Sequence, residues 1–213
     1  MEAVGQTGAM KIDELEVADS AEAWRAAGFT VDGDVCNVGS VRIRLADVEG
    51  KYGILGWSMT DLPREVKDID GVPTGLSASS RVDPSTHLNG VTSIDHVVLM
   101  SPNLTRTRAE LAQFGLEPRR ERDGELGGMS IRQIFYRFDD VIVEVVGDRA
   151  AENPGPSSLW GITFNVADID ASAAFFGERT GRVKDAVQPG RRITTLRHRD
   201  LNMSVRTALI SER

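Results

Sequence analysis

The alternation of apolar and polar residues along this chain predicts one recurring order of elements: a strand, a helix and three further strands. The order is clearest over residues 93–150, where Asn103 is placed to begin a helix and Gly115 to end it. The strands predicted for this unit cover residues 94–100, 117–122, 131–138 and 141–146. The tight turn at Asp139 and Asp140 joins the last two into an antiparallel hairpin.

The same order is predicted twice more. Residues 158–210 repeat it, with a helix that begins at Asp168; the strands predicted there cover residues 159–166, 183–188, 192–198 and 201–207. Residues 10–62 give a weaker, degenerate copy, and residues 63–92, rich in Pro, Gly, Ser and Asp, are predicted to be a linker or a long functional loop. A repeat of about 50 residues indicates duplicated units. The predicted fold class is therefore α+β, built from βαβββ modules.

Two polar residues stand inside strands that are otherwise apolar, namely His96 and Glu144. An unpaired imidazole or carboxylate is costly to bury, so the fold must compensate both. Side chains alternate across a strand, and the hairpin register sets Glu144 opposite Phe135. The residues that this counting turns toward one cavity are His96, Gln133, Arg137 and Glu144.

The cavity residues have structural readings as well as chemical ones. His96 is either a buried imidazole satisfied by Glu144 or a backbone carbonyl, or a group that takes part in chemistry or ligand contact. Glu144 has a candidate partner in Arg137, placed diagonally on the neighbouring strand. A buried ion pair and a general base are equally good readings of this carboxylate.

The third unit is expected to supply the other wall of the cavity. Thr195 and Arg197 fall on its inward face by the same counting. The hairpin turn Pro189-Gly190 is flanked by three polar residues, Gln188, Arg191 and Arg192. An arginine there is expected to reach over the cavity mouth and hold an anionic or carbonyl-bearing ligand. A solvated turn is the equally weighted alternative.

Several other residues have expected positions but no chemical role. Trp24, Trp57 and Trp160 lie in apolar stretches and are expected in the core, whereas His87 is expected to be exposed in the linker. Cys36 is the single cysteine of the chain, so it has no partner for a disulfide or a thiol metal site. It is expected to be reduced and to act as a small apolar residue.

Composition narrows the classes of partner. The formal net charge of -7 disfavours nucleic acid, whose binding depends on clustered Lys and Arg. No apolar run approaches the roughly 20 residues that cross a bilayer, and the first ten residues lack a basic region followed by an apolar one. We expect a cytoplasmic protein with no membrane partner.

Two short motifs carry a resemblance to a known superfamily. Ile-Asp-His-Val-Val at residues 94–98 opens the middle unit and Val-Glu-Val-Val-Gly at residues 143–147 closes it. They resemble the vicinal oxygen chelate superfamily of glyoxalases, dioxygenases and bleomycin-resistance proteins, and residues 186–195 resemble a bacterial glyoxalase-like group. The resemblance implies that the second and third modules pair into a half-open barrel around a cavity, with an additional degenerate N-terminal module.

The resemblance also implies where a metal would bind. In that superfamily the ligands come from the first and fourth strand of each module, and His96 and Glu144 match these positions in the middle unit. The third unit has Gly161 and Ser204 at the matching places, so two of four ligands are missing. We expect no tightly bound divalent metal, or at most a weak one at His96 and Glu144 completed by water or a ligand, and no other cofactor.

Three classes of function stay open at this point. The first is a small-molecule lyase, isomerase or hydrolase that uses His96 and Glu144 as an acid and base pair. The second is a metal-free binding protein of the bleomycin-resistance type, and the third is a structural homologue without a working site. The expected partner is a small polar or anionic molecule, and a homodimer is compatible with all three classes.

Overall fold

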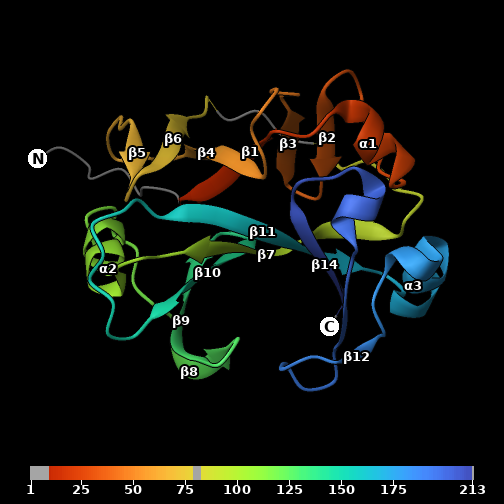
Figure 1. Cartoon of the computed structure of the whole chain (residues 1–213). Coiled ribbons are helices and arrows are strands. Elements are labelled where there is room, and N and C mark those ends of the chain that lie inside the picture. Colours follow the sequence, from red (N-terminus) through yellow and green to blue (C-terminus); the bar gives the residue numbers. More distant parts are fainter. Residues whose placement is uncertain (1–9, 79–82, 213) are drawn as a thin grey trace, which may run out of the picture.

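The computed structural model describes residues 10–78 and 83–212, which fold into two β-sheets stacked on one another (Figure 1). The N-terminal sheet has six strands in the order β2-β3-β1-β4-β6-β5, and the C-terminal sheet has eight in the order β12-β13-β14-β11-β7-β10-β9-β8. Figure 1 shows that the outer strands of the C-terminal sheet curl away from the N-terminal sheet. The C-terminal sheet therefore has a concave face that the N-terminal sheet does not cover.

The elements of the N-terminal sheet are β1 (Lys11–Val17), α1 (Ala21–Ala26), β2 (Val35–Val38), β3 (Val41–Leu45), β4 (Ile54–Thr60), β5 (Asp68–Ile69) and β6 (Val72–Leu76). The middle module comprises β7 (Val91–Met100), α2 (Leu104–Ala112), β8 (Arg120–Leu126), β9 (Met129–Phe138) and β10 (Val141–Asp148). The third module comprises β11 (Ser158–Val166), α3 (Ile169–Phe176), η1 (Gly177–Arg179), β12 (Lys184–Asp185), β13 (Arg192–Thr195), η2 (His198–Leu201) and β14 (Arg206–Ser211).

The C-terminal sheet is a pair of βαβββ modules. In each module the first strand lies parallel to the last, β7 beside β10 and β11 beside β14, and the antiparallel pair β7 and β11 joins the modules. The predicted caps form: Asn103 accepts a hydrogen bond from the Arg106 amide, and Asp168 accepts from the amides of Asp170 and Ala171. The predicted α+β fold of paired modules that form a half-open barrel is confirmed.

The N-terminal sheet differs from the degenerate βαβββ-like module expected for residues 10–62. Strand β1 is parallel to β3 rather than to β4, and β4 is antiparallel to β1. Strands β5 and β6 lie within residues 63–92, and β6 pairs parallel with β4. The segment read as a linker therefore completes the sheet. Its Pro and Gly residues fit an edge hairpin as well as a loop, so amino-acid composition alone could not predict these two strands.

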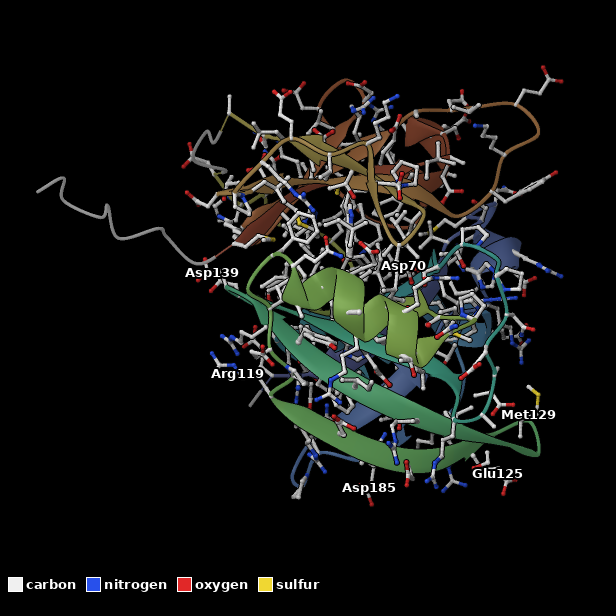
Figure 2. All side chains as sticks on the ribbon, turned by 90° about the vertical axis from the view of Figure 1, so that its left-hand side faces the viewer. Asp70, Arg119, Glu125, Met129, Asp139 and Asp185 are labelled. Atoms are coloured by element: carbon white, nitrogen blue, oxygen red, sulfur yellow. The ribbon has the colours of Figure 1, made fainter. Side chains whose placement is uncertain are left out.

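The core lies mainly between the two sheets. Trp57 of β4 stacks 5.9 Å from Phe138 of β9, and Trp24 of α1 packs against Phe164 of β11 at 6.3 Å between ring centroids. A buried polar junction adds to this contact: the Asp70 carboxylate, in the β5–β6 turn, accepts hydrogen bonds from Arg106 and Thr107 of α2 and from Ser157. Figure 2 places Asp70 where the N-terminal sheet meets α2.

The third module departs from the predicted strand boundaries. Strand β13 ends at Thr195, a 3-10 helix replaces the predicted turn, and β14 begins only at Arg206. The cause lies far away in the sequence, because the buried Asp19 carboxylate accepts hydrogen bonds from the amides of Ser204 and Val205. Gly161 consequently pairs with Arg206, and Ser204 does not occupy the strand position that matches Glu144.

Candidate functional site

The concave face of the C-terminal sheet holds a pocket of about 560 Å³, which we call the His96 pocket. Strands β7, β9 and β10 form its floor, and the segment from Lys184 to Gln188 with Ile193 closes its far side. The polar and charged residues that line it are His96, Arg119, Arg120, Arg122, Gln133, Arg137, Glu144, Lys184, Asp185 and Gln188. Its volume is in the range that small-molecule sites occupy.

The register of the middle module turns the expected residues into this pocket. Phe135 pairs with Glu144 and Arg137 with Ile142, and Ile142 pairs in turn with His96 on β7. The structure therefore brings together four residues that strand counting had grouped: His96, Gln133, Arg137 and Glu144. Their chemical role is a separate question, which depends on the contacts they make.

His96 stands between two carboxylates. Its Nδ1 lies 2.7 Å from Asp95 Oδ2, and its Nε2 lies 3.4 Å from Glu144 Oε2. All three side chains are largely buried, with 14% of His96, 9% of Asp95 and 12% of Glu144 exposed. Because an ionised carboxylate only accepts hydrogen bonds, Nδ1 of His96 carries the proton that points at Asp95. The second nitrogen, Nε2, then faces Glu144 at the pocket floor.

A β-bulge explains why Asp95 and His96 can touch although they are neighbours on one strand. His96 pairs with Thr163 and Ile94 pairs with Phe164, which leaves Asp95 as an extra residue on β7. A bulge of this kind bends the strand and re-aims a side chain. Strict alternation would have turned Asp95 to the opposite face. Asp95 is therefore a site residue that the sequence pattern did not reveal.

Arg191 holds Asp95 in place from the other side. Its Nη1 donates to Asp95 Oδ1 at 2.6 Å, its Nη2 to Asn165 Oδ1 at 2.6 Å, and its Nε to the carbonyl of Ser211 at 2.7 Å. Burial raises the pKa of Asp95, but the hydrogen bonds from His96 and Arg191 outweigh it and hold that pKa below its ordinary value. The expectation that Arg191 reaches over the cavity mouth is corrected, since it is 4% exposed and fully engaged.

Glu144 is held by an amide rather than by the expected arginine. Gln133 donates a hydrogen bond to Glu144 Oε1, and Arg122 Nε donates to Gln133 Oε1 at 2.9 Å. Arg137 instead donates to the backbone carbonyl of Asp139. The Glu144 carboxylate therefore has one oxygen committed to Gln133 and the other turned to His96, with no direct cation among the described contacts.

The remaining predicted residues lie in three different places. Gln188 lines the His96 pocket. Arg192 lies outside it and pairs with Asp170 at 2.7 Å, so its expected reach over the cavity is not observed. Thr195 and Arg197 line a neighbouring pocket on the same sheet. The hairpin turn thus contributes one of its three polar residues to the pocket, because its two arginines are taken by carboxylates.

Positive charge gathers around the His96 pocket in a chain whose net charge is -7. Four arginines and Lys184 line it, against the carboxylates of Glu144 and Asp185. The side chains of Arg119 and Arg120 pair with no carboxylate among the described residues. Figure 2 places Arg119 and Asp185 on the part of the C-terminal sheet away from the N-terminal sheet. Free guanidinium groups at a pocket attract an anionic ligand.

The donor set does not complete a metal centre of the usual kind. Within the described part of the chain, no group of three or more His, Cys, Asp or Glu side chains is placed to hold a metal ion. A metal at His96 and Glu144 would have two protein ligands, whereas catalytic metal sites usually have three. The facing positions on β11 and β14 are Gly161, Thr163 and Ala208, which cannot replace an imidazole or carboxylate.

Trp160 is a second residue that the sequence analysis misjudged. Its side chain was expected in the core, and it is 44% exposed, whereas Trp24 and Trp57 are buried as expected. Trp160 is skipped in the pairing of β11 with β7, so a bulge turns it outward. His87 is the opposite case, since it was expected on the surface and is buried.

Comparisons with known proteins give the fold. No protein-family model matches the sequence, and no curated protein matches it. A variant of 4-hydroxymandelate synthase from Streptomyces coelicolor is 14% identical with a TM-score of 0.62, covering 97% of this chain and 93% of that one. A fusion of a xylose isomerase-like TIM barrel with 4-hydroxyphenylpyruvate dioxygenase is 13% identical with a TM-score of 0.59, covering 96% of this chain and 49% of that one.

Methylmalonyl-CoA epimerase from Mycobacterium tuberculosis is 14% identical with a TM-score of 0.47, covering 61% of this chain and 93% of the epimerase. Among the described residues, no helix has the length and apolar character needed to span a membrane. At identities this low, the two structures with TM-scores above 0.5 show a likeness of fold and not of reaction. The fold of this chain is therefore similar to the folds of the 4-hydroxymandelate synthase and dioxygenase structures.

Proposed function

We propose that this protein is an enzyme that moves a proton on a small anionic molecule, using His96 and Glu144 in the His96 pocket. The observation that carries the proposal is the line of contacts from Arg191 through Asp95 and His96 to Glu144. A base oriented by a second group is the arrangement that acid–base catalysis needs. The fold, shared with enzymes of several reaction types, is compatible with this chemistry.

The geometry favours one shared proton between His96 and Glu144. With Nδ1 protonated toward Asp95, a neutral imidazole would present a lone pair to the Glu144 carboxylate at 3.4 Å. Two acceptors at this separation repel each other, so a proton on either Nε2 or Oε2 relieves the contact. The pair can then accept a proton from a substrate at one atom and return one from the other. This supports an isomerase or lyase that acts on a carbon next to a carbonyl group.

The arginines of the His96 pocket can stabilise the negative charge that this reaction creates. Removing a proton next to a carbonyl places negative charge on the oxygen, which fixed donors stabilise in a site that excludes water. Arg119 and Arg120 are free to contact a carboxylate or phosphate of the substrate, and Arg122 is anchored by Gln133 beside Glu144. The substrate class that fits is therefore a small carbonyl compound that bears a carboxylate or phosphate.

The test is proton exchange in deuterated water. Pyruvate, 2-oxobutyrate and dihydroxyacetone phosphate are incubated with the protein, and loss of the proton next to the carbonyl is followed by NMR. We expect exchange faster than in buffer for at least one compound, and a loss of about 100-fold or more in His96→Gln and in Glu144→Gln. Glu121→Gln, a change on the exposed edge strand β8, is the matched control and should retain the rate.

The outcomes separate the three classes of function. Thermal melts of each variant establish that it is folded. Compounds that bind without any exchange contradict the enzyme and point to a binding protein. Compounds that neither bind nor exchange leave a structural homologue, and exchange that survives in both variants shows that other residues carry the chemistry.

A further inference from the structure

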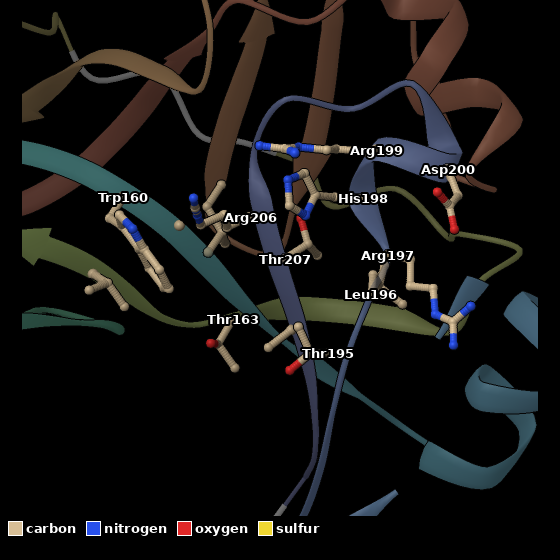
Figure 3. A pocket seen from close by; sticks show the side chains of 14 residues that line it. Trp160, Thr163, Thr195, Leu196, Arg197, His198, Arg199, Asp200, Arg206 and Thr207 are labelled. Atoms are coloured by element: carbon tan, nitrogen blue, oxygen red, sulfur yellow. The ribbon is translucent and has the colours of Figure 1, made fainter. Parts of the chain in front are cut away.

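A second pocket of about 600 Å³ lies beside the His96 pocket on the C-terminal sheet. We call it the Trp160 pocket. Figure 3 shows Trp160 with Arg206 next to it, His198 and Arg199 along one side, and Thr163 and Thr195 at the other. No element of the proposed acid–base chemistry uses these side chains, so the pocket needs its own explanation.

The chemistry of the Trp160 pocket is that of a site for a flat anion. The indole of Trp160 is 44% exposed, and the guanidinium carbon of Arg206 lies 4.8 Å from its ring centroid. Arg197 and Arg199 are exposed and pair with no carboxylate within the described chain, although Asp200 also lines the pocket. An exposed indole stacks on planar groups, and free guanidinium groups bind carboxylates or phosphates.

The local charge balance is positive. Burial lowers the pKa of His198, and the nearby charges of Arg206 and Arg199 lower it further. The imidazole is therefore largely neutral near pH 7, and the cations of the pocket are its three arginines. Like charges gathered at one surface repel one another, and an anionic ligand bound there would relieve that repulsion.

The two pockets meet along two strands. On β7, His96 lines the first pocket and Val98 the second; on β13, Ile193 lines the first and Thr195 the second. Residues two apart on a strand lie on the same face, about 7 Å from one another. Thr163 of the second pocket is also the cross-strand partner of His96. The pockets are therefore neighbouring parts of one concave surface.

We infer that the Trp160 pocket binds the remote end of the substrate: a flat, conjugated group that bears a negative charge, joined by a short spacer to the part that reacts at His96. This inference rests on the proposed function for its reacting end. The two-part ligand matches the two sets of free arginines, one set at each pocket. A compact substrate such as pyruvate would leave the second set without a role.

The test uses a linked probe and its two halves. The probe is 4-(2-carboxyethyl)benzoate, which carries a benzoate ring and a second carboxylate on a two-carbon spacer; the halves are benzoate and propionate. Binding is measured by titration calorimetry. We expect the linked probe to bind at least about 10-fold more tightly than either half, because the second contact becomes intramolecular.

Variants locate the aromatic end. Trp160→Leu and Arg197→Gln should each weaken the linked probe by about 5-fold or more, while propionate binding stays unchanged. Arg192→Gln is the matched control, since Arg192 is an exposed arginine of the same module and pairs with Asp170 outside both pockets. Trp160 and Arg197 are exposed, so the variants should fold, and thermal melts check this.

The result distinguishes this inference from the proposed function. A linked probe that binds no better than benzoate, or that binds equally well to Trp160→Leu and the parent, overturns the two-part site. His96→Gln should retain the binding of benzoate, because the aromatic end does not touch His96. Tight binding of the probe by a protein that fails the exchange test would contradict the chemistry and support the site.

Discussion

The two sheets of this protein carry charged residues in contrasting ways. On the N-terminal sheet, Glu14 and Glu16 of β1 face Arg42 and Arg44 of β3 in a ladder of ion pairs. Each arginine has a carboxylate beside it, and buried Asp13 adds another partner to Arg42. The charges of this ladder satisfy one another, as they do in a scaffold.

The concave face of the C-terminal sheet leaves arginines without such partners. Arg119 and Arg120 at one pocket, and Arg197 and Arg199 at the other, pair with no carboxylate among the described residues. The two sheets share the same arrangement, an antiparallel central pair flanked by parallel partners. The difference teaches that pairing of charge, more than topology, separates the supporting sheet from the one that offers a site.

The largest loss of stability is expected at the polar junction between the N-terminal sheet and the middle module. Asp70→Ala removes the carboxylate that Arg106, Thr107 and Ser157 share, and leaves the buried end of the Arg106 guanidinium without its counter-charge. We expect the free energy of unfolding to fall by about 3 kcal/mol. Urea denaturation measures it, with the exposed Asp140→Ala as control. A loss no larger than that of the control would mean that the junction does not hold the sheets together.

The ladder itself should contribute less. Glu14→Ala takes the shared partner from Arg42 and Arg44, which are partly exposed. We expect a loss of about 1 kcal/mol or less in the free energy of unfolding, reduced further by salt. Urea denaturation at low and high ionic strength measures both. The exposed Glu152→Ala should cost nothing, and equal effects of the two variants would break the contrast drawn between the sheets.

We expect acidic pH to lower the free energy of unfolding through His87, which joins the segment before β7 to the N-terminal sheet. Its Nδ1 accepts from the Thr30 amide at 3.0 Å, so Nε2 donates to the Asn37 carbonyl at 3.1 Å. Burial lowers the pKa of His87 below its ordinary value. The unfolded chain therefore takes up a proton that the folded chain refuses, and stability falls as pH drops below about 6.5.

Denaturation midpoints near neutral and mildly acidic pH check the expectation. His87→Gln should be less stable at neutral pH and should lose less stability between the two conditions. The lowered pKa of His198 acts in the same direction and remains in the variant, so part of the slope should persist. An unchanged slope would remove His87 as its source.

The smallest change in stability is expected for the free arginines. Arg119→Gln combined with Arg120→Gln breaks no ion pair within the described residues, so the free energy of unfolding should stay within about 0.5 kcal/mol of the parent. Propionate or phosphate binding should weaken in the same variant. A loss of more than about 1 kcal/mol would place these arginines with the scaffold and remove the contrast between the sheets.

Regular features of the sequence predicted the regular features of the structure. Helix caps at Asn103 and Asp168, and the hairpin register that sets Glu144 opposite Phe135, depend on local rules and are observed. The two residues most clearly missed, Asp95 and Trp160, are both skipped in the β7–β11 pairing. A bulge breaks the period of two on which the counting relies, so alternation assigned each to the wrong face.

Other misreadings arose from distant contacts. Asp19 binds the segment before β14 from a position 185 residues away in the chain. Asp95 binds the side chain of Arg191, which lies 96 residues further along the chain. No local pattern records such a partner. The unpaired arginines were also invisible from the sequence, because a charge is free only when the folded chain brings no carboxylate to it.

The hydrogen bonds from Ser204 and Val205 to Asp19 bear on how this protein is made. A ribosome that adds about 5 to 20 residues per second needs roughly 10 to 40 seconds to travel between these positions. During that interval the Asp19 carboxylate can accept a hydrogen bond from the ring of Trp24, but its two later donors have not yet been synthesised. The N-terminal sheet is thus synthesised first, but it acquires its last buried contacts only when the end of the third module emerges.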